Sequence, residues 1–246
     1  MKDKYRQQWE CLGKLDPYWA VLSDHSKRGG KWESAEFFHT GECEIAALMG
    51  RMKSLGLNIN RKRALDFGCG VGRLTQALSE YFTQVLGVDI SSSMLDEARR
   101  ANATKANIKF LQNTDQNLAL CADNSVDFIY SNIVLQHMPK ERQLIFLSEF
   151  FRILAGGGTA VFQTPSGPNY RSWQGWVFRL LGYKNLNRIR KVIYGGPSGI
   201  MEIHACPQNE VIALLRDEGV ELVQRDANFN TGKALTSYMY YVCKPV

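Results

Sequence analysis

The most informative stretch of the sequence is Leu65-Asp66-Phe67-Gly68-Cys69-Gly70-Val71-Gly72-Arg73, in which three alternate glycines follow a short apolar run. Residues 64–67 are typical of a buried strand, and residues 73–82 place apolar side chains at helical spacing. Glycines between a strand and a helix permit positive φ angles and let the backbone approach a ligand closely. The amide groups at the start of the helix favour anionic groups. The stretch therefore predicts a ligand-binding turn at the carboxyl end of a strand.

The residues after Arg63 alternate between short apolar runs and amphipathic helical segments. Strands are predicted at residues 64–67, 84–90, 108–111, 126–131 and 159–164, and helices at residues 73–82, 91–102 and 139–154. This alternation is typical of an α/β fold with a doubly wound, mostly parallel sheet and helices on both faces.

The C-terminal part of the chain follows a different pattern. A helix is predicted at residues 207–218, and strands at 221–226 and 236–243 flank the turn-prone Asn230-Thr231-Gly232. Because these two strands are too close in sequence for a helical crossover, we expect an antiparallel hairpin at one edge of a seven-stranded sheet.

Two further regions surround this sheet. Residues 1–60 are predicted to form an N-terminal helical cap, because Asp16-Pro17 is a good helix start and apolar residues recur at helical spacing before Gly56. Residues 61–246 are expected to form the doubly wound domain. Its insertion at residues 167–205 shows no clear strand, and we expect it to be a lid over the substrate, since long insertions in compact domains are often functional.

The composition excludes several classes of protein. The chain has 246 residues, of which 45% are hydrophobic and 22% charged, which is ordinary for a globular protein. No run of about 20 apolar residues is present, and the first ten residues lack an apolar secretory core, so a cytoplasmic protein is predicted. The six cysteines are scattered and are expected to be reduced thiols. Much of the net charge of +6 lies in residues 171–191, which contain Lys and Arg but no Asp or Glu.

The spacing of the glycines distinguishes between nucleotide-binding motifs. The dinucleotide fingerprint GxGxxG fails, because Arg73 or Thr75 stands where its last glycine is needed, and no phosphate-binding Gly-Lys-Ser/Thr follows. An acid, Asp66, instead precedes the glycines, and a second acid, Asp89, ends the next predicted strand. A carboxylate at the second place can accept hydrogen bonds from both hydroxyls of a ribose.

These features resemble the class I S-adenosylmethionine-dependent methyltransferases, and the resemblance runs from about Lys62 to the C-terminus. It implies that S-adenosyl-L-methionine is the cofactor, that Asp89 binds its ribose, that Met94 packs near the adenine and that Asp115 accepts from the adenine amino group. The segment 131–137 is similar to the family segment at the methionine end. The cofactor-binding residues implied in this way are Asp66, Gly68, Cys69, Gly70, Gly72, Asp89, Ile90, Met94, Thr114, Asp115, Gln116, Ser131, Asn132 and Gln136.

The resemblance also implies a reaction, the transfer of a methyl group to an oxygen or nitrogen, less often a carbon, of a small organic acceptor. His137, beyond the fourth strand, is the first candidate for a general base, and His204 is the second. Each has a simpler interpretation, a helix cap or core residue for His137 and a packing residue for His204. No metal is expected, because no cluster of ligating residues has metal spacing. Aromatic residues of the predicted cap favour a partly apolar acceptor: Trp9, Tyr18, Trp19, Phe37 and Phe38.

Other functions stay open at this point. The chain could bind the cofactor without catalysis, or it could methylate nucleic acid through its basic insertion, although it lacks the Asn/Asp-Pro-Pro-aromatic signature of many such enzymes. Residues 171–191 could equally be a lid, a phosphate-contacting patch or an interfacial amphipathic helix that contacts a membrane surface. The sequence makes no prediction of the oligomeric state.

Overall fold

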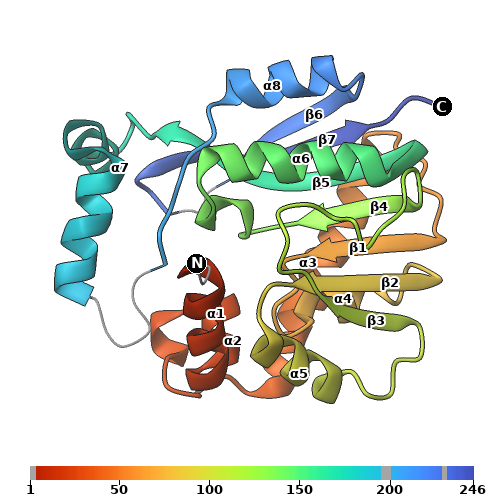
Figure 1. The fold of residues 1–246 in the computed structure, drawn as a ribbon, viewed down its shortest axis with the longest axis horizontal. Coiled ribbons are helices and arrows are strands. Elements are labelled where there is room, and N and C mark those ends of the chain that lie inside the picture. Colours follow the sequence, from red (N-terminus) through yellow and green to blue (C-terminus); the bar gives the residue numbers. More distant parts are fainter. Residues whose placement is uncertain (1–3, 195–200, 229–231) are drawn as a thin grey trace. The chain divides into compact units, whose positions relative to one another are not determined.

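The computed structural model describes residues 4–194, 201–228 and 232–246 (Figure 1). Its described residues form a seven-stranded sheet in the order β3-β2-β1-β4-β5-β7-β6. The pairs β1–β2 and β2–β3 are parallel, whereas β5–β7 and β7–β6 are antiparallel, which confirms the predicted fold class. The strands are β1 (Arg63–Phe67), β2 (Gln84–Asp89), β3 (Ile108–Gln112), β4 (Val126–Ser131), β5 (Leu154–Pro168), β6 (Glu221–Asn228) and β7 (Leu235–Cys243).

Helices precede, connect and follow these strands. The α-helices are α1 (Lys4–Leu15), α2 (Pro17–Val21), α3 (Ser34–Ser54), α4 (Arg73–Leu78), α5 (Ser92–Ala101), α6 (Lys140–Ile153), α7 (Trp173–Tyr194) and α8 (Gln208–Asp217). Two short 3₁₀-helices, η1 (His25–Lys27) and η2 (Leu135–His137), complete the described elements.

The chain divides into two compact units, which are described separately. Unit 1 comprises the residues up to Asp115 together with Val126–Ile129, and unit 2 comprises Gln116–Ser125 and Tyr130–Val246. The helices of the predicted cap, α1 to α3, belong to unit 1 together with β1, β2 and β3. That residues 1–60 form a domain of their own stays a prediction.

The N-terminal helices of unit 1 begin and end where local chemistry predicts. Asp16 caps α2 by accepting a hydrogen bond from the Trp19 amide at 3.4 Å. Helix α3 buries Ile45 and Met52 and ends just before Gly56, whose φ of +70° suits the turn that follows. The aromatic residues of this region pack on one another. Tyr18 stacks on the buried Phe37 at 4.5 Å between ring centroids.

Helix α4 is shorter than the predicted helix at residues 73–82. After Leu78 the amide of Tyr81 bonds to the Leu78 carbonyl at 2.9 Å, which is a tighter turn than an α-helix makes. The side-chain amide of Asn107 donates to the Ser79 and Phe82 carbonyls at 2.9 and 3.2 Å. Phe82 itself is buried. These tertiary contacts end the helix one turn early and lead the chain into β2.

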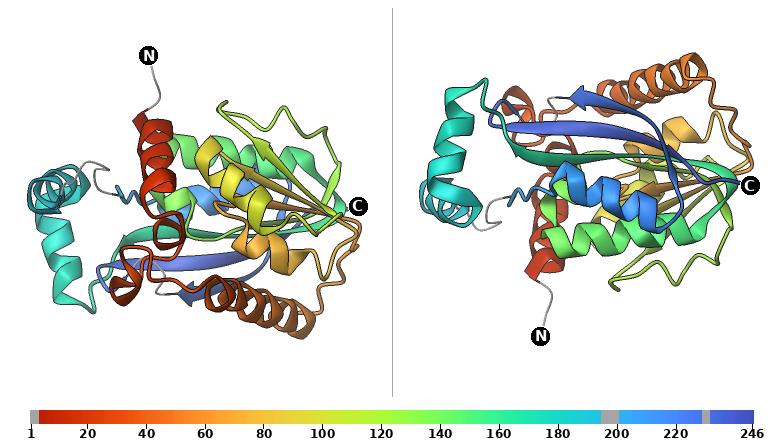
Figure 2. Two further views of the ribbon diagram at one scale, coloured as in Figure 1. Left: turned by 90° about the horizontal axis from the view of Figure 1, so that it is seen from below. Right: turned by 90° about the horizontal axis from the view of Figure 1, so that it is seen from above.

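Unit 2 is built on the long strand β5, which extends well beyond the predicted residues 159–164. Pairing with β7 runs from Thr159 opposite Cys243 to Pro168 opposite Leu235, so the partner strand keeps the chain extended. Strands β6 and β7 form the predicted antiparallel edge hairpin, although the first two residues of its Asn230-Thr231-Gly232 turn lie outside the described residues. Helices α6 and α8 lie side by side along these strands, and α7 lies beyond the end of β5 (Figure 2).

Candidate functional site

The glycine turn of unit 1 has the backbone conformation that the sequence predicts. Gly68, Gly70 and Gly72 have φ values of +76°, +54° and +82°, which residues other than glycine rarely adopt. The amide of Gly68 donates to the Val88 carbonyl of β2 at 2.7 Å. A Cβ at Gly72 would lie 2.8 Å from the ring of Phe110, so this position also needs glycine for space. The turn is thus a preformed backbone cradle between β1 and α4.

Asp89 links this cradle to the next strand. One carboxylate oxygen accepts from the Gly70 amide and the other from the Ser91 amide, both at 2.9 Å. Burial raises the pKa of Asp89, and backbone hydrogen bonds from Ser91, Gly70 and Ile90 oppose that rise by favouring the charged form. The structure therefore brings together two of the predicted cofactor residues, Gly70 and Asp89.

Asp66 lies deeper than Asp89. Its carboxyl group is 2% exposed and accepts a hydrogen bond from Thr75 Oγ1 of α4 at 2.6 Å. Burial raises its pKa to about 7, and the Thr75 hydrogen bond limits the rise. The Cys69 side chain is also buried, packed against Leu95 and Phe110. Asp66 thus fixes α4 against β1, and Cys69 offers a ligand only its backbone.

The ends of β2 and β3 are tied together beside this turn. The Asn113 amide donates to the Asp89 carbonyl at 2.9 Å, and Gln112 Nε2 donates to the Ile90 carbonyl at 2.9 Å. Met94 is fully buried at the start of α5. Three further predicted cofactor residues follow β3 and are exposed. Thr114 and Asp115 belong to unit 1, and Gln116 belongs to unit 2.

The N-terminal helix α1 supplies a residue that sequence reasoning missed. The Glu10 carboxylate accepts hydrogen bonds from Ser91 Oγ at 3.0 Å, Ser92 Oγ at 3.1 Å and the Ser93 amide at 3.4 Å. Burial opposes ionisation of Glu10, but these hydrogen bonds outweigh it and lower its pKa. Ser91 Oγ also caps α5 by accepting a hydrogen bond from the Met94 amide at 3.3 Å. No sequence signal connects residues that stand about eighty positions apart.

Helix α2 covers the glycine turn itself. A Cβ at Gly70 would lie 2.5 Å from Val21 Cγ2, so the bare glycine backbone is what lets α2 approach. Helix α1 therefore packs on the start of α5, and helix α2 packs on the glycine turn.

In unit 2, a buried polar network surrounds the end of β4. Gln163 is fully buried, and its amide donates to Ser237 Oγ at 2.5 Å and to Gln136 Oε1 at 3.3 Å. Its carbonyl oxygen accepts from the amide of Ile133 at 3.2 Å. Ile133 has a φ of +62°, a strained value for a β-branched residue that is typical of functional sites. Two sequence features point to this network, the polar residue inside the apolar run of β5 and the predicted cofactor residue Gln136. Two predicted cofactor residues, Ser131 and Asn132, immediately precede Ile133.

The two candidate histidines, His137 and His204, both lie close to Glu202. His137 Nδ1 lies 2.9 Å from the Glu202 carbonyl oxygen, which can only accept a hydrogen bond, so Nδ1 carries the ring hydrogen and donates it. His137 Nε2 lies 3.3 Å from the Gln136 amide nitrogen. His204 Nε2 lies 3.4 Å from the Glu202 carboxylate, and the His204 amide donates to the Gln136 carbonyl at 2.7 Å. Glu202 thus connects both histidines within unit 2.

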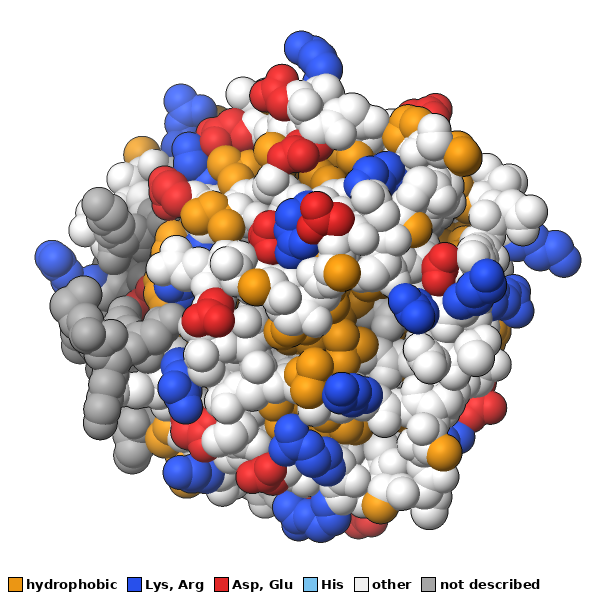
Figure 3. Space-filling model, turned by 45° about the vertical axis from the view of Figure 1, so that its right-hand side comes forward, with side chains coloured by type: hydrophobic (Ala, Val, Ile, Leu, Met, Phe, Trp, Pro, Cys, Tyr) orange, Lys and Arg blue, Asp and Glu red, His pale blue; other side chains and the backbone are white. Residues whose placement is uncertain are grey.

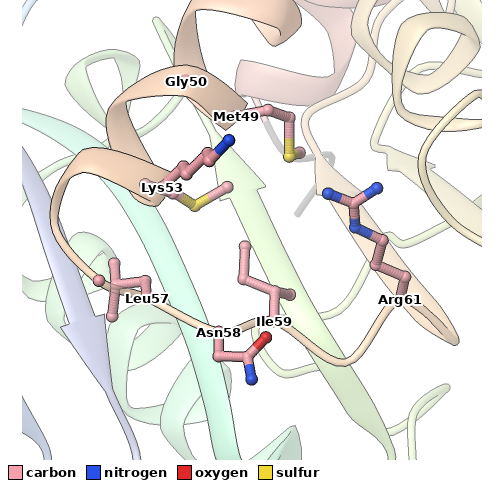
Figure 4. A pocket seen from close by; sticks show the side chains of 9 residues that line it. Met49, Gly50, Lys53, Leu57, Asn58, Ile59 and Arg61 are labelled. Atoms are coloured by element: carbon pink, nitrogen blue, oxygen red, sulfur yellow. The ribbon is translucent and has the colours of Figure 1, made fainter.

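Other features of the described residues lie apart from these groups. A cavity of about 460 Å³ at the end of α3 is lined by Lys53, Ile59 and Arg61 among others, and contains none of the predicted site residues (Figure 4). Within residues 4–194, 201–228 and 232–246, no three His, Cys, Asp or Glu side chains gather as a metal site. No helix in the described part of the chain has the length and apolar character needed to cross a bilayer.

Known proteins resemble this chain in sequence. Residues 65–162 match the family model of a methyltransferase domain. A trans-aconitate 2-methyltransferase from Deinococcus radiodurans is 34% identical over 112 residues, 45% of this chain and 40% of that protein. A demethylmenaquinone methyltransferase from Staphylococcus aureus is 33% identical over 120 residues, 48% of this chain and 48% of that protein. The matched stretches therefore span less than half the length of these curated relatives.

Solved structures resemble the whole chain. The crystal structure of magnesium protoporphyrin IX methyltransferase from Synechocystis PCC 6803 with bound SAH has a TM-score of 0.63 at 17% identity, and the match covers 98% of both chains. At this identity the likeness establishes the fold, including the β5-β7-β6 edge. The match to the methyltransferase domain model falls on β1 to β5 of that fold, so this part of the chain is similar to a methyltransferase domain.

Proposed function

We propose that the protein is an enzyme that uses S-adenosyl-L-methionine to methylate an oxygen or nitrogen atom of a small organic molecule. The observation that carries this proposal is the pair of hydrogen bonds from the Gly70 and Ser91 amides to Asp89, both 2.9 Å long. They hold a carboxylate and a glycine cradle together at the carboxyl ends of neighbouring parallel strands, where ligands bind in doubly wound sheets.

The residues of unit 1 fit the two polar ends of this cofactor. The carboxylate of Asp89 suits the ribose hydroxyls, in charge-assisted hydrogen bonds worth about 1.5–3 kcal/mol each. The positive φ values of Gly68, Gly70 and Gly72 keep side chains out of the cradle and leave room for the amino-acid end. When bound, the cofactor supplies a methyl group that its sulfonium has already activated. The protein's main task is then to align the acceptor, which can contribute about 7–11 kcal/mol.

The residues of unit 2 fit the handling of a proton. With its hydrogen on Nδ1 directed at the Glu202 carbonyl, His137 presents the basic lone pair of Nε2. An acceptor hydroxyl would displace the Gln136 amide from Nε2 and pass its proton to the ring. His204 is the second candidate base. The strained Ile133 and the Gln163 network hold the adjoining loop in one conformation.

The names of the relatives support a small-molecule acceptor, since they specify trans-aconitate and demethylmenaquinone. Phe37 and Phe38 are buried and belong to the core of unit 1. The aromatic residues that could still contact the acceptor are Trp9, Tyr18 and Trp19. The lid role of residues 167–205 and the cytoplasmic location stay predictions.

A labelled-methyl transfer assay tests the proposed function. The purified chain is incubated with methyl-labelled cofactor and, separately, with the small-molecule and nucleic-acid fractions of a cell extract, and labelled products are identified by mass. Transfer that disappears in Asp89→Ala but persists in Asp96→Ala, an exposed acid on α5, supports the proposal. Cofactor binding with no transfer to any fraction would favour a binding protein. Label found in the nucleic-acid fraction would favour the nucleic-acid alternative.

A further inference from the structure

Helix α7 of unit 2 exposes an apolar face. Eight large hydrophobic side chains are exposed among the described residues, and five of them lie between Tyr170 and Leu181, so the apolar surface is concentrated there. Trp173 is 72% exposed, Trp176 52% and Leu180 82%. Their spacing of three and then four residues places them on one side of a helix, with Leu181 beside them. We call Trp173, Trp176, Leu180 and Leu181 the apolar face of α7.

The opposite side of α7 is the one that packs on the protein. Gly175 is buried, and it approaches the backbone of Asn169 so closely that a Cβ would overlap the Asn169 carbonyl oxygen. A surface helix ordinarily turns its apolar stripe inward and its polar side outward. Helix α7 does the reverse in its first two turns, because its glycine faces inward and its tryptophans face outward. An exposed apolar patch of this kind marks an interaction surface.

Contacts around Tyr170 hold this face in place. The indole nitrogen of Trp176 donates to the Tyr170 carbonyl at 3.2 Å, and the two rings lie 5.4 Å apart. The Arg179 guanidinium lies 5.6 Å from the Tyr170 ring. The helix is interrupted at Gly182, where φ is +68°, so its N-terminal half presents the apolar face as a separate segment.

The segment that carries the apolar face is rich in positive charge. Residues 171–191 contain six Lys and Arg and no Asp or Glu, and the side chains of Arg171, Arg179 and Arg188 are exposed. Elsewhere on the molecule, charges of both signs are interspersed over the face that Figure 3 shows. Tryptophan and leucine on one side with arginine at the flanks are the composition of helices that lie in the surface of an anionic membrane.

We propose that the apolar face of α7 docks on an anionic lipid surface. A second copy of this chain is a poorer occupant, because a symmetric contact would bring two sets of cations together. A nucleic acid would use the arginines but leave Leu180 and Leu181 without an apolar partner, and the Trp176 indole nitrogen is already bonded to Tyr170. This proposal does not depend on the methyltransferase activity, and it adds a location for the enzyme to the reaction proposed above.

Flotation with lipid vesicles tests the docking. The full chain is mixed with vesicles of phosphatidylcholine alone or of phosphatidylcholine with phosphatidylglycerol, and the bound fraction is measured over a range of salt. Binding to the anionic vesicles should be at least about tenfold tighter than to the neutral ones, and it should weaken as salt increases. Leu180→Glu should lower that binding by about tenfold or more. The matched control Ile145→Glu changes another exposed apolar residue, on α6, and should bind as the unchanged protein does.

Several outcomes would overturn the proposal. It is wrong if the unchanged protein does not bind the anionic vesicles, or if Leu180→Glu binds them equally well. Binding to single-stranded or duplex nucleic acid that competes with the vesicles and survives Leu180→Glu would assign the surface to nucleic acid. If the unchanged protein does not bind vesicles, and Leu180→Glu lowers the rate of methyl transfer in free solution, then α7 would be a lid. Because Leu180 is exposed, Leu180→Glu should fold as the unchanged protein does. An unchanged melting temperature verifies this.

Discussion

The carboxylate of Glu10 accepts a hydrogen bond from the Ser91 hydroxyl at 3.0 Å, which ties the first helix of the chain to the start of α5. Ser91 in turn donates its amide to Asp89, the proposed ribose ligand. The N-terminal helix is therefore connected to the proposed cofactor site through two hydrogen bonds in series. Removing the first should loosen α1 and α2 without removing any residue that we expect to touch the cofactor.

Glu10→Gln should destabilise the protein by about 1–3 kcal/mol, because the neutral amide is a weaker acceptor for the three serine donors. Since the pKa of Glu10 is lowered on folding, the stability that its charge contributes is present above the unfolded pKa and is lost as the pH falls through the folded value. Denaturant unfolding at neutral and acidic pH measures both effects. The exposed Glu42→Gln is the control, and an equal loss there would contradict the role of Glu10.

Gly70→Ala should destabilise the protein more than Gly56→Ala. Both glycines have positive φ, at +54° and +70°, so both variants carry the backbone strain of about 1–2 kcal/mol. Only at Gly70 would the new Cβ meet another side chain, Val21 Cγ2, whereas Gly56 has open space around it. The difference in unfolding free energy between the two variants isolates the contact with α2. Partial recovery in the double variant Gly70→Ala/Val21→Ala would support this reason, and no recovery would contradict it.

Asp89→Ala should weaken the binding of S-adenosylhomocysteine by about ten- to a hundredfold or more, since it removes the acceptor of two hydroxyl hydrogen bonds. Calorimetric titration measures the affinity. The same variant frees the Gly70 and Ser91 amides, so thermal melting must show that it is still folded. Unchanged affinity would remove the ribose assignment, and Asp96→Ala provides the comparison with an exposed acid on the following helix, α5.

His137→Asn should lower the rate of methyl transfer to a hydroxyl acceptor by about a hundredfold or more, as expected for loss of a general base. Asparagine can still donate to the Glu202 carbonyl but cannot accept a proton at neutral pH. The affinity for the cofactor should change little. The pH profile of kcat separates a base from a packing residue, because only loss of the base removes its acidic limb. His39→Asn, in an exposed position on α3, should have no effect on either quantity.

Asp66→Asn should abolish part of the pH dependence of stability. The pKa of Asp66 rises from 3.8 to about 7 on folding, so the folded protein holds this proton more tightly than the unfolded chain. The stabilisation from the protonated group is present below the unfolded pKa and is lost as the pH rises through about 7. Unfolding of the free protein between about pH 4 and pH 8 should therefore show a steeper decline than in Asp66→Asn. The exposed Asp217→Asn should keep the decline, and a slope that Asp66→Asn leaves unchanged would contradict this assignment.

Features that depend on residues close in sequence could be predicted from the chain alone. The order of strands and helices, the caps at Asp16 and Ser91, and the positive φ values of Gly68, Gly70 and Gly72 all follow from local spacing and side-chain chemistry. The antiparallel edge hairpin follows from the short stretch of sequence between β6 and β7, which is too short for a helical crossover. The glycine turn and Asp89 resemble the same positions in class I S-adenosylmethionine-dependent methyltransferases. That resemblance is what predicts the cofactor from these local patterns.

Features that join distant residues required the folded chain. The Glu10 contacts with the serines, the approach of Val21 to Gly70 and the early end of α4 at Asn107 each bring together segments that no local pattern connects. The strain at Ile133 and the outward apolar face of α7 likewise depend on which side of each element the rest of the protein covers. Backbone preferences act within a few residues, whereas burial and pairing depend on packing across the whole fold, and packing is what turns a glycine-rich turn into a shaped site.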